Sequence, residues 1–270
     1  MTQIRDPHTV RTGLPGVLWL PTLAALGLIV LPVIGLVVRA PWSRFGELVT
    51  GESARAALEL SLRTAAASTL LCILFGGPLA VVLARGSVPG LRLLRSVVLL
   101  PLVLPPVVGG LALLYLLGVS GFAGYALDVA FGVRVPFTTT AVILAQTFVA
   151  MPFLVVSLEG ALRTGGERYE VIAATLGATP WTVFRRITVP LVLPGLGSGM
   201  VLSFARCLGE FGATIAFAGS LQGVTRTLPL EVYLREETDV DGAIALSLLL
   251  VVVAIVVVAV ARPRSAEGLG

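Results

Sequence analysis

Lysine is absent from this chain of 270 residues, and the sequence contains only one histidine and two cysteines. A phosphate-binding loop needs a lysine after its glycine-rich segment, so this chain cannot carry such a loop for ATP. His8, Cys72 and Cys207 have no metal-ligand or catalytic neighbours at the usual spacing, which argues against a metal site and against histidine-based catalysis. We therefore expect no catalytic residue, no metal and no cofactor in this chain.

Charged side chains are also scarce. They make up 13% of the residues, whereas hydrophobic residues make up 56% and the mean hydropathy is +0.99. A soluble domain of this length needs a charged surface, so most of this surface is expected to face lipid. The pI near 9.7 would suggest a nucleic-acid partner, but the arginines form no patch with interleaved aromatic residues, so no such partner is expected.

Six apolar runs are long enough to cross a bilayer as helices, and they lack the alternation that strands would show. The first run is too long for the apolar core of a cleavable signal peptide. The chain is therefore expected to be an all-α, polytopic membrane helical bundle of about six transmembrane helices, located in the cell membrane. The expected spans are Leu14–Val38, Leu60–Leu83, Leu93–Leu117, Thr139–Leu158, Leu191–Ala218 and Ala243–Ala261.

The segments that connect these runs alternate in arginine content. Eleven arginines lie in the two tails and in the second and fourth loops, whereas the segments on the opposite side hold six arginines and eight acidic residues. Because an excess of arginine marks the cytoplasmic side, both termini are expected in the cytoplasm. The predicted organisation is a cytoplasmic tail over residues 1–13, a transmembrane domain over 14–261 with a cytoplasmic loop over 160–190, and a cytoplasmic tail over 262–270.

Proline and glycine are expected to interrupt three of the runs, because proline removes a backbone donor and glycine permits close helix approach. Kinked spans often line a pathway, although both residues are frequent in membrane helices in general. The densest cluster, from Pro101 to Gly110, makes Pro105 and Pro106 candidate pathway residues. The other interruptions are expected at Pro152 in the fourth run and at Pro190 and Pro194 in the fifth.

The longest arginine-rich loop has the pattern of two short helices. Arg163 to Leu176 is predicted as an amphipathic helix that ends at Gly177, a residue typical of the position after a helix. Thr179-Pro180 then has the pattern of a helix start. Such a hairpin without catalytic groups is typical of a docking element that buries its apolar face in a partner, but a helix lying on lipid headgroups would have the same pattern.

The same loop resembles the EAA loop of ABC-importer permeases, whose pattern is E-x-A-A, three residues, G, nine residues and I-x-L-P. Two apolar residues, Ile172 and Val189, depart from this pattern. The resemblance implies that the loop inserts into a cleft of a cytoplasmic ATPase and that the glutamate contacts that ATPase, which would use the ATP and Mg²⁺. The matching positions, and so the implied docking residues, are Glu170, Ala173, Gly177, Ile187 and Pro190.

Three further stretches, Phe204–Ile215, Gly223–Leu230 and Leu104–Gly110, are similar to molybdate permeases. The resemblance implies a type I ABC-importer permease fold and import of molybdate by alternating access. The implied partners are cytoplasmic ATPase subunits, an extracytoplasmic molybdate-binding protein, a second copy of this chain and membrane lipid. The alternatives are a sulfate or tungstate permease and, from other classes, an ion-coupled secondary transporter or a membrane enzyme, for which the deep charged residues are too few.

Arg206 and Glu210 lie four residues apart near the middle of the fifth run. A charge at that depth costs about 2.5–3.5 kcal/mol, so the two side chains are expected to pair inside the bundle. They either belong to an anion pathway, with Arg206 attracting the oxyanion, or form an internal pair that fixes helix orientation. Together with Thr214, Pro105 and Pro106 they are the candidate pathway residues.

Two charged features lie on the side opposite the loop. Glu59 and Arg63, near the end of the second run, are expected to pair on one helix face. The segment Glu231–Asp241 carries five acids, which would repel a free oxyanion and so favour delivery by a carrier protein, but which equally fit a solvated loop.

Overall fold

The computed structural model describes residues 15–86, 89–165 and 167–260, and in these ranges every regular element is a helix. The chain forms two units, Met1–Ala40 and Pro41–Gly270. The first unit contains α1 (Trp19–Arg39), which follows a short 3-10 turn, and its apolar length matches the first expected span. The predicted tails, with Leu14 and Ala261, lie outside the described residues.

Four helical runs of the second unit are long and apolar enough to cross a membrane. Together with α1 they make five candidate spans. A sixth is formed by two helices with a sharp bend between them, Leu91–Val103 and Pro106–Leu117, which confirms the expected number. The long runs are α3 (Glu52–Leu71) continued through a π turn, η2 (Cys72–Gly76), into α4 (Gly77–Arg85); α8 (Thr139–Gly165); α10 (Pro180–Val183) continued through the π turn η3 (Phe184–Thr188) into α11 (Val189–Leu208); and α14 (Val240–Val260).

The third expected span is not one helix. It consists of α5 (Leu91–Val103) and α6 (Pro106–Leu117), whose axes differ by 113°. The break falls at Leu104-Pro105, where both residues have extended backbone angles, with ψ near 135° and 132°. Two consecutive prolines remove two backbone donors and force the preceding residue out of the helical region, so the chain turns here.

The fifth expected span is also divided, but its prolines are not the reason. Helix α11 continues through Pro194 and ends at Leu208, and α12 (Gly212–Ala218) follows after a break of three residues. Likewise α8 continues through Pro152, so the predicted interruption of the fourth run at that residue is wrong. Neighbouring helices support a proline inside a membrane helix, whereas the break after Leu208 occurs where a glycine is followed by the charged Glu210.

Three short helices were not expected from the hydrophobic pattern. They are α2 (Phe45–Thr50), α7 (Phe122–Phe131) and α13 (Leu228–Glu236). All three lie in the segments that separate the apolar runs, and α7 packs against α6 while α13 packs against α3 and α14. Their short length leaves the 3.6-residue periodicity too weak to recognise in the sequence.

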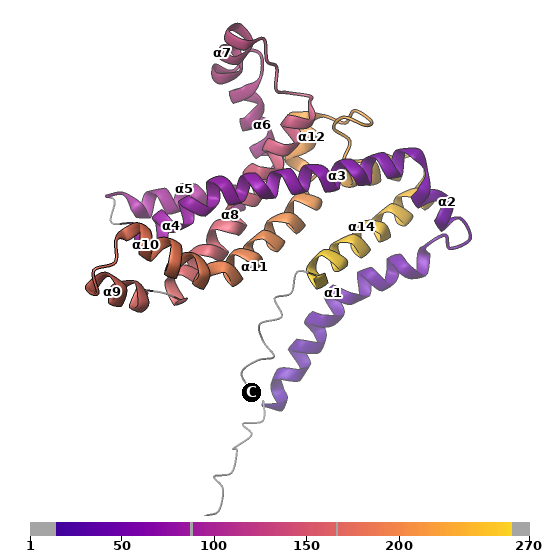
Figure 1. Ribbon diagram of the computed structural model, residues 1–270. Coiled ribbons are helices and arrows are strands. Elements are labelled where there is room, and N and C mark those ends of the chain that lie inside the picture. Colours follow the sequence, from indigo (N-terminus) through magenta and orange to yellow (C-terminus); the bar gives the residue numbers. More distant parts are fainter. Residues whose placement is uncertain (1–14, 87–88, 166, 261–270) are drawn as a thin grey trace, which may run out of the picture. The chain divides into compact units, whose positions relative to one another are not determined.

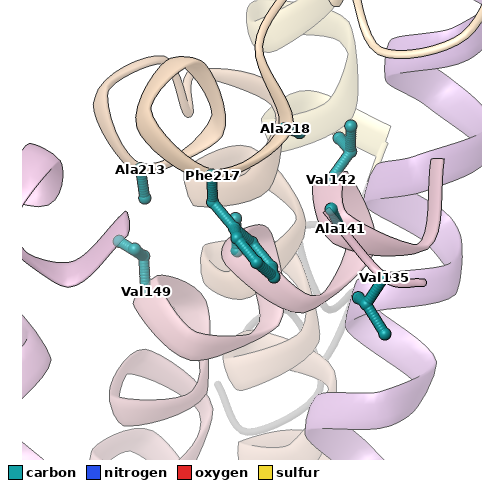
Figure 2. Packing of buried hydrophobic residues seen from close by; sticks show 8 residues of the cluster. Val135, Ala141, Val142, Val149, Ala213, Phe217 and Ala218 are labelled. Carbon is teal, nitrogen blue, oxygen red and sulfur yellow. The ribbon is translucent and has the colours of Figure 1, made fainter. Parts of the chain in front are cut away.

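Helix α8 is the centre of the second unit, since it packs against α3, α4, α11 and α12 (Figure 1). Phe217 of α12 lies among Val142 and Val149 of α8 in a fully apolar cluster (Figure 2). Helix α6 approaches α12 so closely that a β-carbon on Gly110 would lie 2.5 Å from the carbonyl oxygen of Ala213. The two short helices that follow the two breaks therefore pack directly against each other.

Candidate functional site

The predicted hairpin lies at one end of the bundle, beside the ends of α4 and α8 (Figure 1). We call residues 160–190 the docking loop, after the role that the sequence predicts for it, and this end of the bundle the loop side. The first helix of the hairpin is not a single helix over Arg163–Leu176: α8 continues to Gly165, and α9 occupies Glu167–Thr175. The second is not separate from the membrane helix, because α10, η3 and α11 form one continuous run from Pro180 to Leu208.

The turn between the two parts of the loop agrees with the sequence. Gly177 has φ +87°, the left-handed conformation in which a β-carbon is disfavoured. Its backbone N–H donates to the carbonyl of Ala174, and the next N–H donates to that of Ala173, which satisfies carbonyls at the end of α9. Thr179 accepts a hydrogen bond from the N–H of Thr182 at 3.3 Å, so it caps α10 as predicted.

The docking loop presents an apolar face outward. The side chains of Tyr169 and Ile172 on α9 and of Leu176, in the turn that follows it, are exposed, the last to 82%. Trp181 on α10 is also exposed and stacks on Phe184 with ring centroids 5.8 Å apart. No other element among the described residues covers this face, so the loop offers large apolar side chains to a partner or to lipid.

Glu170 points the opposite way, toward the bundle. Its carboxylate is 2.9 Å from Nε of Arg85 at the end of α4 and accepts a hydrogen bond of 2.8 Å from the hydroxyl of Thr188 in η3. The side chain is only 16% exposed. The carboxylate therefore points into the bundle and connects α9 to α4 and η3.

The other residues that match the EAA pattern occupy different surroundings. Ala173 and Ile187 are half-buried, whereas Gly177 and Pro190 are exposed. All five positions nevertheless lie on the docking loop or at its return into α11. The structure thus brings the matching residues into one region, with an outward apolar face and an inward acidic group.

Arg85 was not singled out from the sequence. Besides Glu170 it reaches the carbonyl oxygen of Leu162, one of the last residues of α8, at 2.7 Å. In return Arg163 of α8 donates to the carbonyl of Leu83 in the last turn of α4, at 3.3 Å. The last carbonyls of a helix have no partner within the helix and attract cations, so each helix end supplies an arginine for the other. No spacing in the sequence reveals such a pairing, because the partners are 77 and 80 residues apart.

A second acidic residue organises the same end of the bundle. Glu159 of α8 is 2.6 Å from Nη2 of Arg95 in α5 and 2.9 Å from Nε of Arg163. Its side chain is 11% exposed. Helices α4, α5, α8 and α9 are therefore connected on the loop side by one set of ion pairs and helix-end hydrogen bonds, which we call the loop-side network.

The Arg206–Glu210 pair is present, but it lies at the break between α11 and α12 and not within one helix. Arg206 is in the last turn of α11, with its Nη2 2.6 Å from Oε2 of Glu210. The other carboxylate oxygen accepts a hydrogen bond of 2.8 Å from the N–H of Ala213 in the first turn of α12. Glu210 is fully buried while Arg206 remains one-quarter exposed. The carboxylate of Glu210 therefore connects the end of α11 to the start of α12, and one side of the guanidinium of Arg206 remains accessible.

Three other candidate pathway residues lie near this break. A β-carbon on Gly212 would be 2.9 Å from that of Pro106, so the start of α6 rests on the start of α12. Pro105 is the residue that precedes α6. Thr214 is completely buried in α12, and its hydroxyl has no hydrogen-bond partner within the described part of the chain. The candidate pathway residues thus gather where the two helix breaks meet.

The acidic segment on the side opposite the loop is only partly solvated: it begins in α13, and Glu236, Glu237 and Asp241 are exposed, whereas two of its acids form ion pairs. Glu231 of α13 is buried, 3.0 Å from Nε of Arg235 and 3.5 Å from Nη1 of Arg226. Arg235 also contacts Asp239 at 3.4 Å and donates a hydrogen bond of 2.8 Å to Ser53 in α3. We call these residues the far-side network. Glu59 and Arg63, also predicted to pair, do form an ion pair, and both side chains are exposed.

Comparisons with known proteins agree with this architecture. Residues 76–263 match the family described as binding-protein-dependent transport system inner membrane component. The chain is 57% identical to the molybdenum transport system permease protein ModB of Mycobacterium tuberculosis, over 87% of this chain and 89% of that protein. It is 35% identical to the sulfate transport system permease protein CysT of Escherichia coli, over 81% and 80%. A solved bacterial ABC transporter involved in alginate import has the same fold, with a TM-score of 0.69 at 21% identity over 91% of this chain and 92% of that one.

Proposed function

The chain belongs to the family of binding-protein-dependent transport system inner membrane components, and we propose that it is the membrane-spanning permease subunit of an ATP-driven importer that carries molybdate across the cell membrane by alternating access. The observation that carries this proposal is the 57% identity to a molybdenum permease over most of the chain. The identity to a sulfate permease is 35%, which supports a shared origin and leaves sulfate as the second candidate substrate.

The chain would work with several partners. ATPase subunits in the cytoplasm would bind the docking loop and use ATP and Mg²⁺, since the chain lacks lysine for a phosphate-binding loop. A molybdate-binding protein would deliver the anion on the opposite side, and a second copy of the chain would complete the pathway. The arginine excess on the loop side supports a cytoplasmic position for that side and for both termini.

The exposed apolar face of the docking loop supports its role toward the ATPase. A helix that buries an apolar face in a groove gains about 25 cal/mol for each Å² removed from water, and Leu176 and Trp181 are the largest such contributors here. Glu170, Ala173, Gly177, Ile187 and Pro190 would shape the loop that enters the ATPase cleft. Closure of two ATPase subunits on ATP would then move two loops together and tilt the helices attached to them.

The pathway would pass the junction of the two helix breaks. Arg206 is the charged group there that is not completely enclosed, and a guanidinium offers several N–H donors in a plane to a tetrahedral dianion. Glu210 would keep the arginine oriented and would compensate its charge when no anion is present. Pro105, Pro106 and Thr214 surround the same junction, where irregular backbone at membrane depth fits a pathway lining.

The test is uptake of labelled molybdate by cells that lack their own molybdate permease and express this chain with an ATPase and a binding protein of the molybdate type. We expect uptake that requires all three proteins, falls with excess tungstate and persists in excess sulfate. Uptake suppressed by sulfate would assign the chain to sulfate transport. Uptake that persists without the ATPase would contradict the importer mechanism and would favour an ion-coupled transporter.

A further inference from the structure

Helix α9 of the docking loop faces α4 across an open space, and a polar contact bridges the two helices. A cavity of about 420 Å³ lies between α4, α9 and the start of the α10–η3 run. It is lined on one side by Val81 and Arg85 and on the other by Glu170, Val171 and Ala174. Because this space is open, apolar contact alone does not fix the distance between the loop and α4.

Arg85 crosses this space. Its Nε lies 2.9 Å from one oxygen of Glu170, and its Nη2 lies 2.7 Å from the carbonyl of Leu162 at the end of α8. Glu170 in turn accepts from Thr188, which is in the π turn that continues into α11. One guanidinium and one carboxylate therefore connect α4, α8, α9 and the start of α11.

We propose that Arg85 is a positioning residue for coupling: it holds Glu170, and with it the docking loop, at a set distance from α4 and α8, so that a displacement of the loop moves these membrane helices. The proposal rests on the proposed function, since it assigns a route by which movement of the loop reaches the transmembrane helices. It also gives Glu170 a role within the chain, in place of the direct ATPase contact that the EAA resemblance implies.

The chemistry of the pair supports this role. Both side chains are mostly shielded, at 21% and 16% exposure, so water screens their attraction less than it does at a surface pair. The planar guanidinium can bind the carboxylate and the Leu162 carbonyl at the same time, which a lysine ammonium does with less geometric definition. A contact of this kind resists changes in both distance and orientation.

The experiment exchanges the charges of Arg85 and Glu170. It uses the complete complex of this chain, its ATPase and its binding protein, reconstituted into lipid. The variants are Glu170→Arg, Arg85→Glu and the double variant that carries both changes, with Arg85→Lys as the conservative change. The matched control is Arg92→Glu, because Arg92 is an exposed arginine on the same side of the bundle. The readouts are the molybdate transported per ATP hydrolysed, the amount of ATPase that co-purifies, and hydrogen exchange of the backbone amides of α9.

Each single reversal is expected to lower the transport per ATP by about tenfold or more, within the 5–150-fold range of typical coupling between sites, while the ATPase still co-purifies. The exchange of α9 amides is expected to become about tenfold faster, as for a local opening that loses its main contact. The double variant restores the ion pair but not the bond from position 85 to the Leu162 carbonyl, so it should recover a clear part of both values. Arg85→Lys should lie between wild type and the single reversals, and Arg92→Glu should behave as wild type.

Two results would overturn the proposal. In one, Arg85→Glu transports like the wild type; in the other, the double variant remains as impaired as Glu170→Arg, which would mean that Glu170 acts on the ATPase. Failure of the proposed function would look different, because wild-type complex would then show no ATP-driven molybdate uptake. In that case hydrogen exchange of the α9 backbone amides, measured on the full-length chain, still tests the proposal. Glu170→Gln is expected to accelerate this exchange, and unchanged exchange would contradict the contact between Arg85 and Glu170.

Discussion

The loop-side network and the far-side network differ in the distance along the chain that they bridge. On the loop side, Arg85 bonds to residues 77 and 85 positions away, and Arg95 to one 64 positions away. On the far side, the ion pairs connect residues five or four positions apart, and only the bond to Ser53 is long-range. Far-side contacts therefore shape one short helix and attach it to α3, whereas loop-side contacts, apart from the Glu159–Arg163 pair within α8, join helices that are far apart in the sequence.

This difference suggests a division of tasks. The far-side network lies mostly within α13 and its flanking residues and has one bond to α3, so most of it can remain unchanged while whole helices tilt, and its loss should mainly reduce stability. A network between α4, α5, α8 and α9 must follow or transmit every relative movement of these helices, so its loss should reduce coupling. The charge exchange at Arg85 and Glu170 tests the second statement, and three further substitutions separate the two effects.

The largest effect on stability is expected for Glu231→Ala. The change leaves Arg226 and Arg235 without their buried acidic partner, and breaking a buried pair in this way costs about 3–5 kcal/mol. The thermal unfolding midpoint of the purified protein should fall clearly, while the protein that remains folded should transport a normal amount of molybdate per ATP. Glu236→Ala, an exposed residue of the same helix, is the control and should change neither value.

If the ratio of transport to ATP hydrolysis fell in Glu231→Ala as strongly as in Glu170→Arg, the proposed division between the two ends would be wrong. The far-side network would then take part in coupling as well.

An intermediate effect is expected for Gly177→Val. A β-branched residue in the left-handed conformation costs about 1–2 kcal/mol, so the turn should relax and shift the orientation of α9 relative to α10. We expect reduced stimulation of ATP hydrolysis by the binding protein and a fall in the unfolding midpoint that is smaller than in Glu231→Ala. The control is Gly160→Val, because Gly160 lies within α8 and an added β-carbon there meets no other atom within 4 Å. Normal stimulation in Gly177→Val would show that the turn geometry is not needed.

The smallest effect is expected for Glu59→Gln. Its ion pair with Arg63 is local, like the far-side network, but both side chains are exposed. Exposed pairs of this spacing contribute about 0.3–0.5 kcal/mol, so neither the unfolding midpoint nor transport should change measurably. A loss of stability comparable to that of Glu231→Ala would show that burial is not what distinguishes the far-side network.

The parts of the candidate site that depend on neighbours in sequence were predictable. The turn at Gly177 and the cap at Thr179 follow from residue types within a few positions, and the pairing of Arg206 with Glu210 follows from a spacing of four. The inward direction of Glu170 was not predictable, because it depends on where α4 ends relative to α9. The helix break that places Glu210 between α11 and α12 was missed for a similar reason, since the length and overall hydropathy of the run predict one continuous span.

By itself, the sequence determined that this protein enters a membrane, that it has about six apolar spans and that one loop carries a helical hairpin. These properties depend on composition, on the length of apolar runs and on residues close together in the chain. Tertiary structure alone decided which charges meet, which prolines break a helix and that the two breaks lie against each other. The physical reason is that an ion pair or a close helix contact depends on distances of a few ångströms between segments that the sequence separates by tens of residues.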